Sequence, residues 1–128
     1  MALVLCTGSD AVVMKTRQLL LEQAGHTVVL ASNERQVEKA CKDNPFDVVV
    51  IDQNVSPSVK KRFFHLLRED CTTAKILELH RPFNDRVLET ADAWLVMPSE
   101  APEGLSELVT ALAQKMATSS LPSAPAHE

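Results

Sequence analysis

Two short segments bring together the polar residues with the clearest chemical potential. Thr7–Asp10 and Asp52–Ser56 each follow directly after an apolar run that is typical of a buried strand. In the first segment, a glycine between two hydroxyl residues could hold an anion or a flavin phosphate through free backbone amides, or form a tight turn with Ser9 as a helix N-cap. In the second segment, the Asp52 carboxylate could act on a ligand or simply cap a turn.

The other residues with metal-binding or redox chemistry are scattered along the chain. The four histidines, His26, His65, His80 and His127, show no metal-ligand spacing. The three cysteines, Cys6, Cys41 and Cys71, form no CxxC pair and are odd in number, which favours reduced, buried thiols over a disulfide or zinc framework. We therefore expect a cytoplasmic protein.

Five short apolar runs are predicted to be the strands that position the two segments. They are rich in Val, Ile and Leu and span Leu3–Thr7, Thr27–Ala31, Asp47–Ile51, Lys75–Leu79 and Ala93–Met97. The third run is apolar at consecutive positions from Val48 to Ile51, which suits a strand covered on both faces. Such strands are typical of a parallel sheet.

Segments with helical spacing alternate with these strands. The last has the clearest buried stripe, formed by Leu105, Leu108, Val109, Leu112 and Met116. The first, about Asp10 to Ala24, ends at Gly25 as a left-handed residue, and its predicted inward residues are Val12, Val13, Leu19 and Leu20.

Three further helices complete the alternation. The second is predicted to begin after Asn33 as N-cap and to bury Val37, Ala40 and Cys41. The third is marked by Val59, Phe63, Leu66 and Leu67. The fourth, around Asn84–Thr90, has only Val87, Leu88 and Phe83 to anchor it, so we expect it to be the loosest element.

This alternation predicts an α/β fold, a flavodoxin-like doubly wound sheet of five parallel strands in the order 2-1-3-4-5, flanked by five helices. One domain would span residues 1–117, and the polar residues 118–128 would form a flexible tail. In such sheets ligands lie beyond the carboxyl ends of the strands, here where the first and third strands meet. Asp52 would stand at the centre of that crevice.

Charge and hydropathy exclude several classes of partner. The chain has 13 Lys+Arg against 17 Asp+Glu, a formal net charge of -4, and no broad cationic stripe for nucleic acid. The short cluster Lys60-Lys61-Arg62 is expected to be a solvated helix face. The apolar opening Ala2–Cys6 is too short to span a membrane.

Two stretches of the sequence resemble the receiver domains of two-component response regulators. The first is LLLEQAGHTVVLASNERQVEKACKDNPFDVVVID, in which the interval from Gly25 to Asp52 matches the spacing from the family's glycine to its phosphoacceptor aspartate. The second is TADAWLVMPS at Thr90–Ser99, which places Trp94 at the family's aromatic switch position and Pro98 at its proline. The resemblance covers about Ala2 to Met116.

The resemblance implies a phosphoacceptor role for Asp52 and a Mg²⁺ site to which Asp10, Asp52 and the Asn54 carbonyl could contribute. It also implies a partner-binding face with Trp94, Val87 and Pro98. The partners would be a histidine kinase or a downstream effector, or a second copy in a homodimer. Trp94 could equally be a core aromatic of the edge strand.

Several groups that support phosphorylation in the family are replaced here. The acidic pair after the first strand falls on Gly8 and Ser9, and the lysine before the proline is Met97. The switch hydroxyl at the end of the fourth strand falls on Leu79 or His80. The resemblance therefore indicates a degenerate receiver, or pseudo-receiver, that kept its acceptor position.

Three functions remain as hypotheses. The first is a signalling module without enzymatic activity that acts through protein–protein interaction and needs no cofactor. The second is a functional phosphoreceiver in which Asp10 and Asp52 share Mg²⁺. The third is a small flavin- or nucleotide-binding protein of the same fold, which lacks a second glycine-rich or aromatic clamp beside Thr7–Ser9.

Overall fold

The protein is described here by a computed structural model, which places residues 2–83, 86–98 and 103–119, the last five of them as backbone only. Within these residues, strands and helices alternate along the chain. The strands are β1 (Leu3–Thr7), β2 (Thr27–Ala31), β3 (Val48–Ile51), β4 (Lys75–His80) and β5 (Ala93–Val96). The helices are α1 (Ala11–Gln23), α2 (Glu34–Asp43), α3 (Pro57–Asp70) and α4 (Gly104–Ser119).

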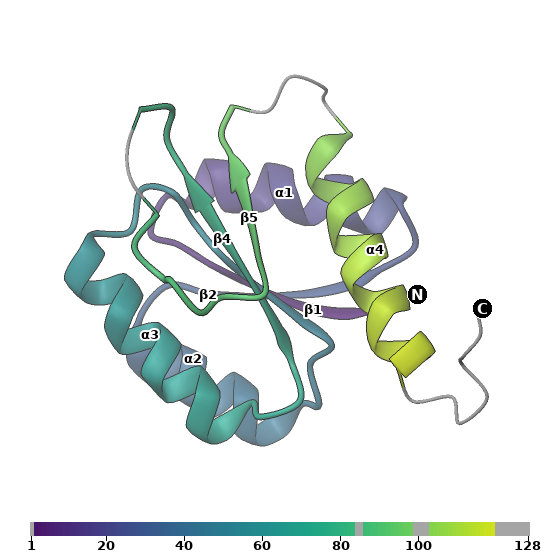
Figure 1. Cartoon of the computed structure of the whole chain (residues 1–128), viewed down its shortest axis with the longest axis horizontal. Helices are drawn as coiled ribbons and strands as arrows, with labels where there is room; N and C mark the ends of the chain where they lie inside the picture. The colour runs from purple at the N-terminus through teal and green to yellow at the C-terminus, as the bar shows by residue number, and fades with distance from the viewer. Residues whose placement is uncertain (1, 84–85, 99–102, 120–128) are drawn as a thin grey trace.

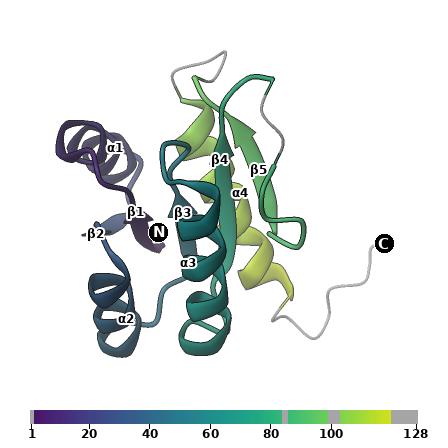
Figure 2. The same cartoon turned by 90° about the vertical axis from the view of Figure 1, so that its left-hand side faces the viewer.

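The strands form one parallel sheet in the order β2-β1-β3-β4-β5, which confirms the predicted topology. The helices α1 and α4 cover one face and α2 and α3 cover the other (Figures 1 and 2). Alternate residues of each strand point to the two faces, so Leu5, Val49 and Ile76 pack toward α2 and α3. Val4, Val50 and Leu77 pack toward α1 and α4.

The end of α1 and the start of α2 lie where the sequence predicts them, at Gly25 and Asn33. Gly25, after α1, has a φ of 97°, the left-handed conformation that glycine adopts without steric cost. Asn33 caps α2 by accepting a hydrogen bond from the Gln36 amide at 2.9 Å. Val37, Ala40 and Cys41 form the buried face of α2, as predicted.

The predicted inward face of α1 is wrong. Val12, Leu19 and Leu20 are 77%, 50% and 42% exposed, and Val13 is half-buried. The residues that face the sheet are Met14, Arg17 and Leu21. A pattern of apolar residues could not identify this face, because one of its three members is an arginine whose charge is satisfied inside the protein.

The predicted helix around Asn84–Thr90 is also wrong where the structure describes it. Asn84 and Asp85 lie outside the described residues, and residues 86–90 form turns and irregular backbone. The amides of Val87 and Leu88 donate to the Glu78 carboxylate at 2.9 and 2.8 Å. Because these amides are bonded to the carboxylate, they do not form the hydrogen bonds of a helix.

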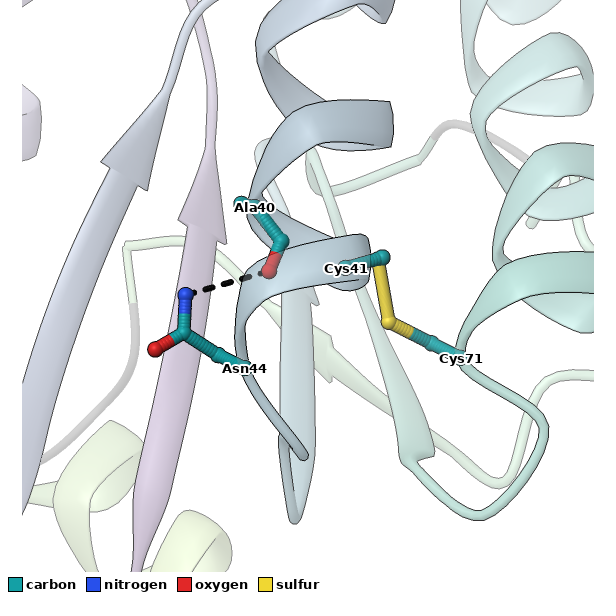
Figure 3. The surroundings of a disulfide bond; sticks show 4 residues. All are labelled: Ala40, Cys41, Asn44 and Cys71. Atoms are coloured by element: carbon teal, nitrogen blue, oxygen red, sulfur yellow. Dashed lines mark hydrogen bonds between the residues drawn. A yellow bond between two sulfur atoms is a disulfide. The ribbon is translucent and has the colours of Figure 1, made fainter.

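A disulfide joins Cys41 near the end of α2 to Cys71 at the C-cap of α3, with their Cα atoms 5.6 Å apart (Figure 3). The expectation of three reduced thiols is therefore wrong for this pair. Cys6 is free and buried, as expected, and burial raises the pKa of its thiol to about 12. An odd cysteine count leaves one thiol unpaired but does not exclude a bridge between the other two.

His26 links the start of the described chain to the middle of α4. Its Nδ1 accepts a hydrogen bond from the Ala2 amide at 3.1 Å, and its Nε2 lies 2.9 Å from the Thr110 hydroxyl of α4. The helix α4 continues through Ser119, so residues 118 and 119 belong to it rather than to the predicted tail, and residues 120–128 lie outside the described part. Leu105, Val109 and Leu112 form its buried stripe, and the side chain of Met116 is not described.

Candidate functional site at the end of β3

Asp52 lies one residue beyond β3, at the carboxyl edge of the sheet. Its amide donates to the Thr7 carbonyl of the neighbouring strand β1 at 3.1 Å, so the ends of β1 and β3 are held together. The side chain is 1% exposed. Asp52 thus occupies the central position in the crevice that the sequence predicts, but it is buried there.

The positive charge that meets this carboxylate comes from α1. The Arg17 guanidinium donates a hydrogen bond to Asp52 Oδ1 and another to Gln53 Oε1, the latter at 2.7 Å. The second carboxylate oxygen, Oδ2, accepts from the Asn54 amide at 3.1 Å. Both oxygens of Asp52 therefore have a partner within the protein, and one partner is a cation that is itself 5% exposed.

Gly8 lies directly against Asp52, at the place where the resembled family has an acidic residue. A Cβ atom on Gly8 would lie 2.9 Å from Asp52 Cβ and 2.7 Å from Met14 Sδ, both closer than van der Waals contact. Gly8 is itself buried, and its amide donates to the Ala31 carbonyl. A side chain at this position would force Asp52 or Met14 to shift.

Asp10 performs a structural task at the start of α1. Its Oδ1 accepts from the amides of Val12 and Val13 at 3.0 and 3.1 Å, so Asp10 is the N-cap and the prediction of Ser9 in that role is wrong. The first free amides of the helix are thereby satisfied by a negative charge of the protein itself. This arrangement does not favour an anion or a flavin phosphate at Thr7–Ser9.

These residues do not fit a magnesium ion. Mg²⁺ requires an octahedral set of oxygen ligands with offsetting negative charge. Here the guanidinium of Arg17 offsets the charge of Asp52, and Asp10 caps a helix. Within residues 2–83, 86–98 and 103–119, no group of three acidic, histidine or cysteine side chains is arranged to hold a metal ion.

The predicted replacements on β4 and β5 lie near the same edge. Leu79 is fully buried in the core beneath α1 and α4, and His80 ends β4 with its Nδ1 3.2 Å from the Arg81 carbonyl. The Met97 amide donates to the His80 carbonyl at 2.7 Å, and its side chain packs on the same core. None of the three supplies a fixed cation or a hydroxyl.

In the predicted partner face, Trp94 is hydrogen-bonded to the loop that precedes β5. Trp94 is half-buried on the edge strand β5, and its indole N–H donates to the Leu88 carbonyl at 3.0 Å. The Arg86 guanidinium lies over the indole ring, 4.6 Å from its centroid. Val87 is half-buried and Pro98 exposed, so Trp94 is both a packed aromatic and a partly accessible one.

A second buried ion pair, which could not be predicted from the sequence, joins α3 to β4 next to this face. Lys60 of α3 donates to Glu78 Oε2 and to the Leu79 carbonyl, both at 2.8 Å, and the two side chains are 4% and 0% exposed. Burial raises the pKa of Glu78, but hydrogen bonds from Lys60 and from the Leu88 and Val87 amides outweigh it, so the net shift lowers the pKa. Lys60 was expected on a solvated face.

No protein-family model matches the chain, and no curated protein matches it. Several solved structures have its fold at low sequence identity. The chemotaxis protein CheY4 of Vibrio cholerae is 24% identical over 88% of this chain and 98% of its own, with a TM-score of 0.73. A chain of the complex between histidine kinase ThkA and response regulator protein TrrA is 22% identical over 88% and 98%, with a TM-score of 0.71.

A third structure was determined with a metal bound. The receiver domain of a sensor histidine kinase from Pseudomonas aeruginosa, with a magnesium ion coordinated in its active-site cleft, is 13% identical. The match covers 88% of this chain and 98% of that one, with a TM-score of 0.67. These similarities show that the chain has the flavodoxin-like fold of receiver domains.

No helix among the described residues is both long and apolar enough to cross a membrane.

Proposed function

We propose that the chain is a receiver-like module of a two-component-type signalling pathway, and that it acts through protein–protein interaction, independently of phosphorylation. The observation that carries this proposal is the buried ion pair between Arg17 and Asp52. The proposal assigns the chain no catalytic role and no cofactor.

The ion pair opposes the chemistry that an acceptor aspartate performs. Attack on phosphorus needs a carboxylate oxygen that is accessible and free, together with cationic groups that stabilise the transferring phosphoryl oxygens. Both oxygens of Asp52 are engaged, and the side chain is buried. Freeing one of them would break a charge-assisted hydrogen bond in a site from which water is excluded, a step that is costly without a replacement cation.

The surface around β5 is the face that the proposal assigns to partners. Trp94, Val87 and Pro98 are partly or fully accessible there, and the hydrogen bond from Trp94 to Leu88 fixes the loop beside them. A preorganised aromatic group costs little conformational entropy when a partner covers it. A histidine kinase, a downstream effector or a second copy of the chain would be the protein that does so.

A phosphorylation assay tests the first part of this proposal. The protein is incubated with acetyl phosphate and Mg²⁺, and its intact mass is compared with that of Asp52→Asn, a typical phosphorylatable receiver serving as positive control. We expect no added phosphoryl group in either form of this protein. A phosphoryl adduct on the wild type that Asp52→Asn abolishes would overturn the proposal in favour of a functional phosphoreceiver.

An interaction assay tests the second part. Histidine kinases, effectors and the chain itself are screened pairwise against the wild type, Trp94→Ala and Val87→Glu. Leu19→Glu is the matched control, because Leu19 is an exposed apolar residue on α1, away from β5. We expect both face variants to lose binding that the control keeps; a partner whose binding neither face variant weakens would contradict the assigned face.

A further inference from the structure

A pocket of about 460 Å³ opens at the carboxyl ends of β3 and β4, beside the buried ion pair of Arg17 and Asp52. Gln53 forms part of its wall, and the same side chain accepts the hydrogen bond from Arg17. Val55, Pro57 and Val87 give the wall an apolar part. The pocket therefore adjoins both the Asp52 site and the proposed partner face without belonging to the acceptor chemistry.

Two exposed guanidinium groups line this pocket. Arg81 donates to the side-chain oxygen of Asn54, and Arg86 is stacked on Trp94. Neither forms an ion pair with a carboxylate among the residues that the structure places, whereas the charge of Lys60 in the same wall is neutralised by Glu78. Among the residues that the structure describes, the contacts of both cations are therefore with neutral groups.

An exposed aromatic residue lies in the same lining. Phe83 is fully exposed, and its φ of 67° lies in the left-handed region that a bulky side chain seldom adopts. Exposed phenylalanine gains from being covered, because burying its ring removes a large apolar area from water. The pocket thus combines cationic groups with an apolar anchor.

We propose that this pocket binds an acidic segment of a partner protein, one that carries at least one apolar side chain beside its carboxylates. Arginine forks match carboxylates in a bidentate geometry, and Phe83 with Val55 and Pro57 would receive the apolar side chain. A free inorganic anion would leave that apolar wall uncovered. A nucleic acid would meet a chain whose formal net charge is -4.

This inference rests on the proposed function and specifies the chemistry of its partner. Random dodecapeptides displayed on phage are selected on the immobilised full chain, and the selected sequences are synthesised for affinity measurements. We expect them to be acidic and to contain an aromatic or aliphatic residue. Arg81→Glu combined with Arg86→Glu should weaken their binding by about tenfold or more, since hydrogen bonds to charged groups are lost.

The matched control reverses two charges elsewhere, by Arg35→Glu and Lys39→Glu on the exposed side of α2, and should leave binding unchanged. Phe83→Ser tests the apolar anchor separately and should also weaken binding.

Selected peptides without acidic character, or acidic peptides that bind both double variants equally, would overturn the inference. Peptides that depend on Trp94 but not on Arg81 or Arg86 would overturn it while leaving the proposed function standing. Inorganic phosphate that displaces the peptides at equal molar concentration would overturn it as well.

Discussion

The guanidinium of Arg17 in α1 is hydrogen-bonded to the carboxylate of Asp52 after β3, and both side chains are almost completely buried. This pair joins α1 to the carboxyl edge of the sheet. The charge of Asp52 at the end of this central strand is thereby offset within the protein. The pair therefore has consequences for stability that can be measured.

Removing one member of this pair should destabilise the fold strongly. Arg17→Met keeps most of the side-chain volume but leaves Asp52 as an uncompensated buried charge, at a cost of about 3–5 kcal/mol in the free energy of unfolding. Urea unfolding followed by circular dichroism measures this change. The double variant Arg17→Met with Asp52→Leu removes both charges and should recover most of the loss, whereas equal stabilities of the single and double variants would contradict the pairing.

A methyl group on Gly8 should disturb the same site from the other side. Gly8→Ala places a Cβ against Asp52 Cβ, which belongs to a fixed part of that side chain, so the contact cannot be relieved by a rotamer change alone. We expect a loss of about 1–3 kcal/mol in unfolding free energy, the usual range for overpacking. Ser9→Ala, at the exposed neighbouring position, is the control and should change stability little. A Gly8→Ala protein as stable as the wild type would contradict the crowding between Gly8 and Asp52.

The fold could be predicted from the sequence because the apolar runs and turn residues act locally. The runs from Leu3 to Thr7 and from Val48 to Ile51 are buried on both faces, and that property is visible in their composition. The order of the sheet then follows from the preference for right-handed crossovers between parallel strands. The inward face of α1 could not be predicted in this way, because it includes Arg17, and the pattern of apolar residues assigns an arginine to the exposed face.

The site was predictable in position but not in its contacts. The apolar run that ends at Ile51 placed Asp52 at the strand end, whereas its partner Arg17 is 35 residues away along the chain. The pair of Lys60 and Glu78 could not be predicted for the same reason. Lysine and glutamate are usually exposed, and only the packing of α3 on β4 brings these two together. The Cys41–Cys71 bridge likewise depends on how the ends of α2 and α3 meet.

Glu78 should be needed for the loop that replaces the predicted fourth helix. Glu78→Gln leaves Lys60 without a counter-ion and weakens the bonds to the Val87 and Leu88 amides, so we expect a loss of about 3 kcal/mol in unfolding free energy. Because the folded pKa of Glu78 is lowered, its contribution is present above the usual glutamate pKa and is lost as the pH falls through the folded value. Urea unfolding at a series of pH values measures both effects.

The matched control for this change is Glu69→Gln, an exposed carboxylate near the end of α3 that pairs with His65 at the surface. It should alter the free energy of unfolding by no more than about 0.5 kcal/mol. Hydrogen exchange adds a local measurement, since the amides of Val87 and Leu88 should lose protection in Glu78→Gln. Unchanged protection of these two amides would contradict the assigned role.

Reduction of the bridge between α2 and α3 should weaken the fold by an amount set by the loop that it closes. Cys41 and Cys71 are 30 residues apart, which corresponds to about 3.5 kcal/mol in the chain-entropy estimate. The unfolding midpoint is compared with and without dithiothreitol for the wild type and for Cys41→Ser with Cys71→Ser. We expect reductant to lower the midpoint of the wild type only. Free-thiol counting in the native protein provides the independent check, and three reactive thiols after denaturation without reductant would contradict the bridge.

The stability of the protein should also decrease under mildly acidic conditions because of His26. Burial, followed by the positive charge of the amino terminus, lowers the pKa of this histidine from its ordinary value of 6.5. Its Nδ1 must stay unprotonated to accept the Ala2 amide, while its Nε2 faces Thr110. The unfolded chain therefore binds a proton that the folded chain excludes, and the free energy of unfolding falls as the pH drops below 6.5 and through the lowered folded value.

Urea unfolding between neutral and mildly acidic pH measures this effect. The free energy of unfolding should fall with pH in the wild type and in the control His65→Gln, whose histidine is exposed. His26→Asn, which can still accept from the Ala2 amide, should reduce this pH dependence. A pH dependence that persists in His26→Asn would assign it to another group.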